Sequence, residues 1–457
     1  MKKIYYYAML FAMAGTLTLG LTACGDDDDD NTPQPEKTPE TKALEDQTGS
    51  ATPASYNAAD DSDVSSKSWA EADYRKDEYG DEAMESCDDV IAELTSATDA
   101  VLKAKLTAAQ ESELRLSVAA TVNNVIIPTY TKLADAAEQL QAALGNVSAS
   151  AITQANIDKA CAAFKEARAW WEMSEAFLGG AASDFDIDPT IDSWPLNRDL
   201  LHSYFTTGAY SEEALEDCSI LGFHALEFVL FRDGKNRTVA DFQKNDTYKG
   251  FTDVPAAEEL KYAQAVAKEL VNRCYQLQVS WQLKPDQNRL DAVKAAGLKY
   301  QTTKGKSFGW NLMYAGDANS TFSSLTDALQ QLLNADEGSC AAIADEVGTG
   351  KIGHPFEAGY IFYVESPYSY NSIVDFRNNI RSIANVWYGN PKGVNGMAEH
   401  SLHKFFTAVA PTVAKDVEES IATAIQKVGG MPYPFVKYVS VLWNKSFEDD
   451  PVVEIEE

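Results

Sequence analysis

Apolar residues recur every three or four positions along most of this chain, the spacing that places them on one face of an α-helix. These segments are rich in Ala, Leu, Glu, Lys and Gln, and the alternating β-branched runs typical of strands are few. The pattern predicts an all-α protein, with helices at about 77–105, 108–144, 153–179, 198–207, 212–231, 255–281, 286–297, 318–346, 372–388, 398–409, 412–428 and 434–446. Pro128 predicts a kink or an interruption in the second helix, because proline lacks the helical N–H.

The first 24 residues have the organisation of a lipoprotein signal peptide. Lys2 and Lys3 form a basic start, residues 4–20 are mostly apolar, and small residues precede Cys24. We expect removal of residues 1–23 and lipidation of Cys24, which would anchor the chain to a membrane. A plain secretory signal is the alternative.

Residues 24–66 are predicted to form a linker, because they contain five consecutive aspartates followed by a stretch rich in Pro, Thr and Ser. The remaining chain is long enough for two domains, which we place at 67–250 and 251–457.

The charge balance argues against one class of partner. With 38 basic and 69 acidic residues, the formal net charge is −31, which repels nucleic acid and concentrates cations near the surface. The five cysteines after Cys24 are widely spaced and contain no Cys-x-x-Cys pair, so they indicate buried thiols rather than a disulfide framework.

Candidate chemistry begins with His224 and Glu227, which lie three residues apart in the apolar run 221–231. A helix would present both on one face, as a nitrogen and an oxygen ligand together. On the predicted helix 153–179, Arg168, Glu172 and Glu175 also share a face, among tryptophans. Satisfied core groups or a surface ion-pair ladder are the alternative interpretation of such pairs.

The segment from Gly179 to Pro195 is a long acidic loop that contains Asp192 and Trp194. Its length and composition are typical of a segment that closes over a site, although a surface loop or a calcium-binding loop are alternatives. For calcium, the later glycine and the terminal glutamate of the helix-loop-helix pattern are absent.

Taken together, these motifs resemble the imelysin-like peptidase family, whose signature Gly-x-His-x-x-Glu is met here by Gly222, His224 and Glu227. The resemblance covers about 115–445 and includes four further segments, at 127–130, 167–177, 191–195 and 365–389. It implies an all-α protein of two helical bundles related by an internal duplication, with the signature helix facing a cleft between them. It also implies a bacterial envelope protein, in some members linked to iron uptake.

The predicted metal ligands are His224, Glu227, Glu172, Glu175 and Asp192. One imidazole with several carboxylates suits iron or another first-row divalent ion, with zinc or calcium as alternatives.

Five further residues are predicted to bind a ligand or to orient the metal ligands. Arg168 would hold a carboxylate or an anionic ligand, and Trp194 comes from the acidic loop. By the resemblance, the opposite wall is formed by Glu365, Ser369 and Arg381.

Other motifs in the chain carry less functional signal. His400 and His403 form a rival pair, but the preceding Gly- and Asn-rich stretch indicates a surface turn. Residues 348–351 lack the first glycine and the hydroxyl residue of a phosphate loop, and neither a His-Glu-x-x-His motif nor a serine-nucleophile signature occurs.

The sequence therefore predicts a surface-exposed lipoprotein of a Gram-negative outer membrane that binds iron or a small ligand in an acidic cleft. A metal-dependent peptidase acting on extracellular protein is the alternative.

Overall fold

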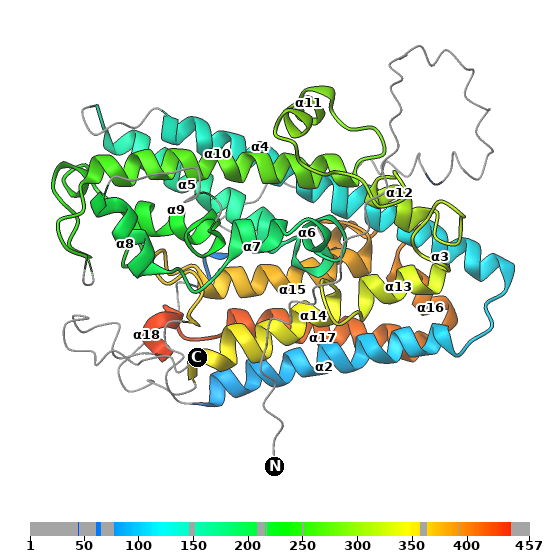
Figure 1. The fold of residues 1–457 in the computed structure, drawn as a ribbon. Helices are drawn as coiled ribbons and strands as arrows, with labels where there is room; N and C mark the ends of the chain where they lie inside the picture. The colour runs from blue at the N-terminus through cyan, green and yellow to red at the C-terminus, as the bar shows by residue number, and fades with distance from the viewer. Residues whose placement is uncertain are drawn as a thin grey trace, which may run out of the picture.

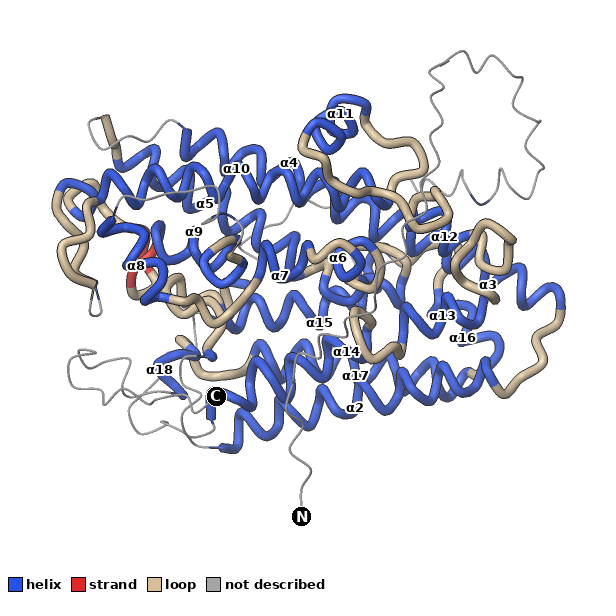
Figure 2. The backbone as a smooth tube through the Cα atoms, in the orientation of Figure 1, coloured by secondary structure: helices blue, strands red, loops and turns tan. Residues whose placement is uncertain are grey.

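The computed structural model describes residues 44, 61–64, 77–145, 151–207, 215, 217–248, 251–356, 363–391 and 393–439. The predicted signal peptide and Cys24 lie outside these residues. Helices dominate the described chain (Figure 2), and its one small sheet is an antiparallel hairpin of β1 (Phe231–Arg232) and β2 (Lys235–Asn236). The all-α prediction is confirmed. Among the described helices, none combines the length and hydropathy needed to cross a membrane.

The helices form two packed groups (Figure 1). The first consists of α4 (Ile127–Gly145), α5 (Gln154–Glu172), α9 (Gly222–Leu230) and α10 (Ala256–Trp281). The second consists of α2 (Asp77–Leu102), α14 (Cys340–Asp345), α15 (Ser372–Tyr388) and α17 (Pro411–Gly429). Helix α15 packs against both α17 and α5, so it joins the two groups. The internal duplication stays a prediction.

This grouping differs from the division expected at residue 250. Helix α10 follows that boundary but packs on α4 and α9, whereas α2 precedes it and packs on α17 and α14. Periodicity identifies the apolar face of each helix but not its partner, so the sequence pattern could not place these two helices.

Shorter elements cover the two groups or connect them. The α-helices among them are α3 (Ala108–Thr121), α6 (Ala181–Asp184), α7 (Ile187–Asp192), α8 (Arg198–Thr207), α11 (Gln287–Ala295), α12 (Phe308–Met313), α13 (Leu325–Leu333), α16 (Leu402–Val409) and α18 (Phe435–Val439). The 3-10 turns are η5 (Glu175–Phe177), η7 (Cys218–Ile220), η8 (Asp241–Gln243), η11 (His354–Phe356) and η13 (Gly393–Gly396).

Four predicted helices are interrupted, and in the one expected at 212–231 the 3-10 turn η7 precedes α9. The helix expected at 108–144 contains a π-helical segment, η4 (Val122–Ile126), directly before Pro128, which confirms the predicted interruption. The helix expected at 153–179 starts after the N-cap Thr153 but ends at Glu172, and residues 175–177 form a separate turn. The helix expected at 318–346 is divided into α13 and α14, each with its own serine N-cap, and continues as the π-helical η10 (Glu346–Gly353).

Part of the predicted linker packs on the helices. Leu44 and Val64 are buried, and Asp61 lies 3.1 Å from Arg377 and 2.8 Å from Arg381 of α15. Asp61 is therefore held against α15 of the second helix group by ion pairs.

Candidate functional site

Arg168, near the end of α5, lies at the centre of a buried cluster of charged side chains. Its guanidinium is fully buried and contacts four carboxylates, those of Asp192, Glu172, Glu365 and Asp375. Glu365 lies 2.5 Å from Nη2, and Asp375 lies 3.3 Å from Nε. Because Glu172 belongs to α5 and Asp375 to α15, the arginine connects the two helix groups through charge-assisted hydrogen bonds and ion pairs.

His224 lies beside the same cluster. Its Nε2 is 3.2 Å from Asp192 Oδ1 and 4.0 Å from Glu365 Oε1, and its Nδ1 is 3.7 Å from Glu227 Oε2. None of these three contacts has the geometry of a hydrogen bond. His224 Nε2 and Glu227 Oε2 are therefore both buried without a hydrogen-bond partner. Buried polar atoms of this kind are costly unless a ligand, an ion or a water completes them.

The other oxygen of Glu227 is fully engaged. Glu227 Oε1 accepts hydrogen bonds from the backbone N–H of Tyr368 (3.0 Å), from the backbone N–H of Ser369 (2.7 Å) and from the Ser369 hydroxyl (2.7 Å). This fixes the carboxylate so that only Oε2 is available toward His224.

A glycine allows His224 to reach Asp192. Gly222 begins α9 with a φ of +68°, and a Cβ there would lie 2.2 Å from the carbonyl oxygen of Ile191. Only glycine tolerates both the left-handed backbone and this close approach. The first helical turn of α9 therefore packs directly on the segment that ends in Asp192.

Burial and neighbouring charges shift the pKa values in opposite directions. Burial raises the pKa of Glu172 and Glu175 well above their usual range, despite nearby cations. For Asp192, burial acts the same way, but Arg168 and His224 outweigh it and hold its pKa below the ordinary value. Burial alone would lower the pKa of His224, but contacts with the Asp192 and Glu227 carboxylates raise it to about 9.

Lys351 is the main site residue that sequence reasoning missed. Its fully buried ammonium group, from η10, lies 3.1 Å from Glu365, 3.5 Å from Glu346 and 3.7 Å from Glu172. The sequence offered only a failed phosphate-loop motif at this position, and the role of Lys351 depends on the tertiary position of η10. Asn379, which donates to Glu172 Oε2 at 2.5 Å, was likewise not singled out as a ligand-orienting group.

Of the remaining predicted residues, Glu175 lies in the cluster, Trp194 lies at its edge and Arg381 lies away from it. Glu175 offers an oxygen within 4.8 Å of ligand atoms of Glu172 and Asp192. Trp194 lies at the edge, where its ring centroid is 5.3 Å from Lys351 Nζ and its indole N–H donates to Tyr363. Arg381 instead contacts Asn378 and Asp61, so the structure directs it to the N-terminal segment.

The rival histidines do not converge on a shared site. His400 pairs with Glu113 at 2.9 Å and His403 with Glu418 at 3.3 Å, each only partly buried. Two groups of three possible metal ligands occur among the described residues, and both belong to the central cluster: Asp192, His224 and Glu365, and Glu172, Glu175 and Asp192.

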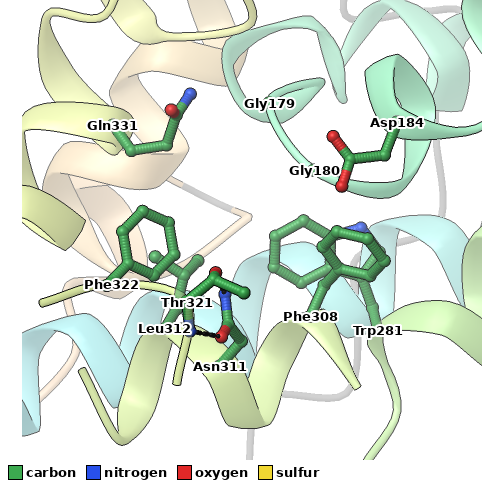
Figure 3. A pocket seen from close by; sticks show the side chains of 10 residues that line it. All are labelled: Gly179, Gly180, Asp184, Trp281, Phe308, Asn311, Leu312, Thr321, Phe322 and Gln331. Atoms are coloured by element: carbon green, nitrogen blue, oxygen red, sulfur yellow. Dashed lines mark hydrogen bonds between the residues drawn. The ribbon is translucent and has the colours of Figure 1, made fainter. Parts of the chain in front are cut away.

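A separate cavity of about 220 Å³ lies beside the start of the acidic segment 179–195 (Figure 3). It is lined by Gly179, Gly180, Asp184, Trp281, Phe308, Asn311, Leu312, Thr321, Phe322 and Gln331. None of the predicted site residues is among these, so this cavity is distinct from the charged cluster.

Comparison with known proteins identifies the family of this fold and cluster. The imelysin family model (peptidase M75) matches residues 126–446. This chain belongs to the imelysin family.

Two relatives carry names that refer to iron. The chain is 28% identical over 313 residues to "Iron-regulated protein A" of Synechococcus elongatus, covering 68% of this chain and 74% of the relative. It is also similar to a crystal structure from Parabacteroides distasonis, named as an iron-regulated protein A precursor, with a TM-score of 0.61 and 25% identity. That match covers 76% of this chain and 92% of the other.

The glycine of the imelysin signature generates the first prediction. Gly222→Ala should lower the free energy of unfolding by about 2–4 kcal/mol, because it adds left-handed strain to a steric clash with Ile191. Urea denaturation measures this change. Gly297→Ala is the matched control, since Gly297 also has positive φ (+69°) but its Cβ would meet nothing within 4 Å; it should cost only about 1 kcal/mol. Equal losses in the two variants would contradict the close-approach explanation.

The shifted pKa values generate a second prediction, for the metal-free protein. Burial raises the pKa of Asp188 to about 7 from 3.8, and that of His224 rises to about 9 from 6.5. Both groups bind protons more tightly in the folded state. The stability that each contributes is therefore complete below its pKa in the unfolded state and is lost as pH rises through its pKa in the folded state. Stability should therefore fall between about pH 4 and pH 9.

Urea titrations at several pH values test this dependence. Asp188→Asn, which mimics the protonated acid, should flatten the decline between pH 4 and 7 by on the order of 1 kcal/mol. Asp186→Asn, at the exposed position just before α7, is the matched control. A decline that is equally steep in Asp188→Asn and in the parent would contradict the assignment.

Proposed function

We propose that this imelysin is an envelope lipoprotein that binds a first-row divalent metal ion, iron foremost, in the charged cluster. The ligands would be Asp192, His224 and Glu365, with Glu172, Glu175 and Glu227 around them. In this proposal Cys24 carries the lipid anchor at the outer membrane, and the bound ion connects the protein to iron uptake.

One observation carries the proposal: buried carboxylates outnumber buried cations around a histidine whose buried Nε2 makes no hydrogen bond. Arg168 and Lys351 are the two permanent cations of the cluster, against the carboxylates of Glu172, Glu175, Asp192, Glu227, Glu365 and Asp375. Uncompensated buried negative charge is unfavourable, so in the metal-free protein it is relieved by protonation, in keeping with the raised pKa values. A divalent cation would relieve it directly.

The donor set favours particular ions. One imidazole and several carboxylates match the preference of Fe²⁺ and Mn²⁺ for mixed nitrogen and oxygen ligands, and the described cluster contains no thiolate. When bound, such an ion would supply charge neutralisation and, for iron, a redox couple. Arg168 and Asn379 would orient the carboxylates, and Ser369 would hold Glu227. The iron-regulated names of the relatives support iron.

Peptide hydrolysis, the activity suggested by the family's peptidase designation, receives less support. A metallopeptidase needs an accessible ion and a neighbouring general base for water. Here the three proposed ligands, Asp192, His224 and Glu365, are each at most 5% exposed, and His224 is the one histidine of the cluster. This arrangement suits retention of an ion better than access of a polypeptide.

Metal titration tests the proposed site. Anaerobic calorimetric titration with Fe²⁺ should give stoichiometric binding to the parent, whereas His224→Ala and Glu365→Gln should each weaken it by at least about tenfold, since each removes a ligand. His403→Ala, which removes a histidine paired with a glutamate outside the cluster, is the matched control and should bind as the parent does.

Unchanged affinity in both ligand variants would refute the site. Incubation with an unfolded protein substrate distinguishes the alternative function: cleavage by the parent but not by His224→Ala would favour the peptidase.

A further inference from the structure

We propose that Lys351 is a built-in counter-ion that occupies a cation position within the charged cluster and must leave before a metal ion binds. This inference rests on the proposed function and concerns the regulation of that same site. It assigns to Lys351 a role in setting metal affinity.

The position of the ammonium group is the first argument. Lys351 Nζ lies 3.1 Å from Oε2 of Glu365, a proposed metal ligand, and 3.7 Å from Oε2 of Glu172, one of the carboxylates around the proposed ligands. A single positive point charge between acidic side chains does the electrostatic work that a metal ion would do there. The ammonium and a metal ion therefore compete for the same oxygens.

The two buried cations of the cluster are held differently. Arg168 contacts four carboxylates through a planar group whose donors are fixed in space. The ammonium of Lys351, on a flexible stem, contacts both oxygens of Glu365, at 3.3 Å and 3.1 Å, and its pairs with Glu346 and Glu172 are longer, at 3.5 Å and 3.7 Å. Arg168 thus holds the carboxylates of the cluster in place, whereas in this proposal a metal ion can replace the ammonium of Lys351.

Two groups beside Lys351 could receive its ammonium once it is displaced. On its outer side Lys351 lies 3.5 Å from Glu346, whose side chain is 39% exposed. It also lies 5.3 Å from the ring centroid of the partly exposed Trp194. An anionic and an aromatic group can both stabilise the ammonium once it leaves Glu365 and Glu172. A small outward rotation of the side chain would exchange the inner pair of contacts for the outer pair.

The backbone that carries Lys351 fits this role. Residues 346–353 form a π-helical segment with glycines at 348, 350 and 353. Short π-helical segments are frequent at functional sites, because their wider turns place side chains where a regular helix would not. Gly348 packs on Cys87 of α2, where an added Cβ would lie 3.2 Å from the cysteine Cβ, so the base of the segment is anchored while Lys351 projects into the cluster.

Substitution of Lys351 tests the inference. Lys351→Met removes the competitor and should bind Fe²⁺ at least about tenfold more tightly than the parent in anaerobic calorimetry. Lys306→Met is the matched control, because Lys306 also lies near a tryptophan ring, 5.0 Å from that of Trp310, but outside the cluster. It should bind as the parent does.

Two further variants separate displacement from simple charge repulsion and guard against misfolding. Lys351→Arg keeps the charge but binds carboxylates in a fixed fork, so displacement predicts weaker Fe²⁺ binding than in the parent, whereas repulsion alone predicts no change. If Lys351→Met does not fold, Lys351→Gln replaces it, with circular dichroism and the Fe²⁺-induced rise in melting temperature as readouts. That rise should exceed the parent's.

The possible outcomes distinguish this inference from the proposed function. If the parent binds Fe²⁺ through His224 and Lys351→Met binds it no more tightly, the counter-ion role is wrong and the metal site stands. If His224→Ala binds as the parent does, or if neither the parent nor Lys351→Met binds Fe²⁺, both proposals fail.

Discussion

The structure around the site depends on one buried guanidinium. Arg168 is fully buried and contacts carboxylates from α5, from α7, from the segment before α15 and from α15 itself, which belongs to the second group. Removing one partner from such a network leaves an uncompensated buried charge, so the partners are mutually dependent. The arginine therefore both joins the two helix groups and fixes the carboxylates that face His224. The glycine of the imelysin signature contributes to the same arrangement. Gly222 lets α9 approach the backbone of α7 at Ile191 closely enough to place His224 beside Asp192.

This arrangement is costly for a protein that only needs to be stable. Ion pairs in the interior seldom stabilise a fold more than apolar residues of the same volume would, and here the carboxylates exceed the cations. Such a surplus is expected where binding, rather than stability, determines which residues are kept at a site. Protons and Lys351 neutralise part of the surplus, which makes the cluster responsive to pH.

The sequence predicted much of this architecture from local patterns. The three-residue spacing of His224 and Glu227 correctly placed both on one buried helix, and Pro128 correctly indicated an interruption. Arg168, Asp192 and Glu365 are far apart in the chain, so periodicity could not group them. Asp192 was placed near the histidine by its position in the acidic loop, and Glu365 by the family resemblance. The structure then brought them into contact.

Other features could not be read from local patterns. The ends of helices were missed where the backbone leaves the helix without a proline or glycine, as after Glu172. The packing of α10 with the first group and α2 with the second depends on which apolar faces meet, and periodicity carries no such information. Lys351 was missed for the same reason, because a lysine in a glycine-rich stretch gives no local sign that its side chain will be buried among glutamates.

The central claim is that this surplus of buried negative charge is reserved for a metal ion that replaces protons. The most direct test is to count the protons released when Fe²⁺ binds, by anaerobic calorimetry at pH 6.5 in two buffers that differ in ionisation enthalpy. At that pH His224, with a pKa of about 9, carries its proton and must lose it to become a ligand, so at least about one proton should leave per ion. Binding with no proton release would contradict the account.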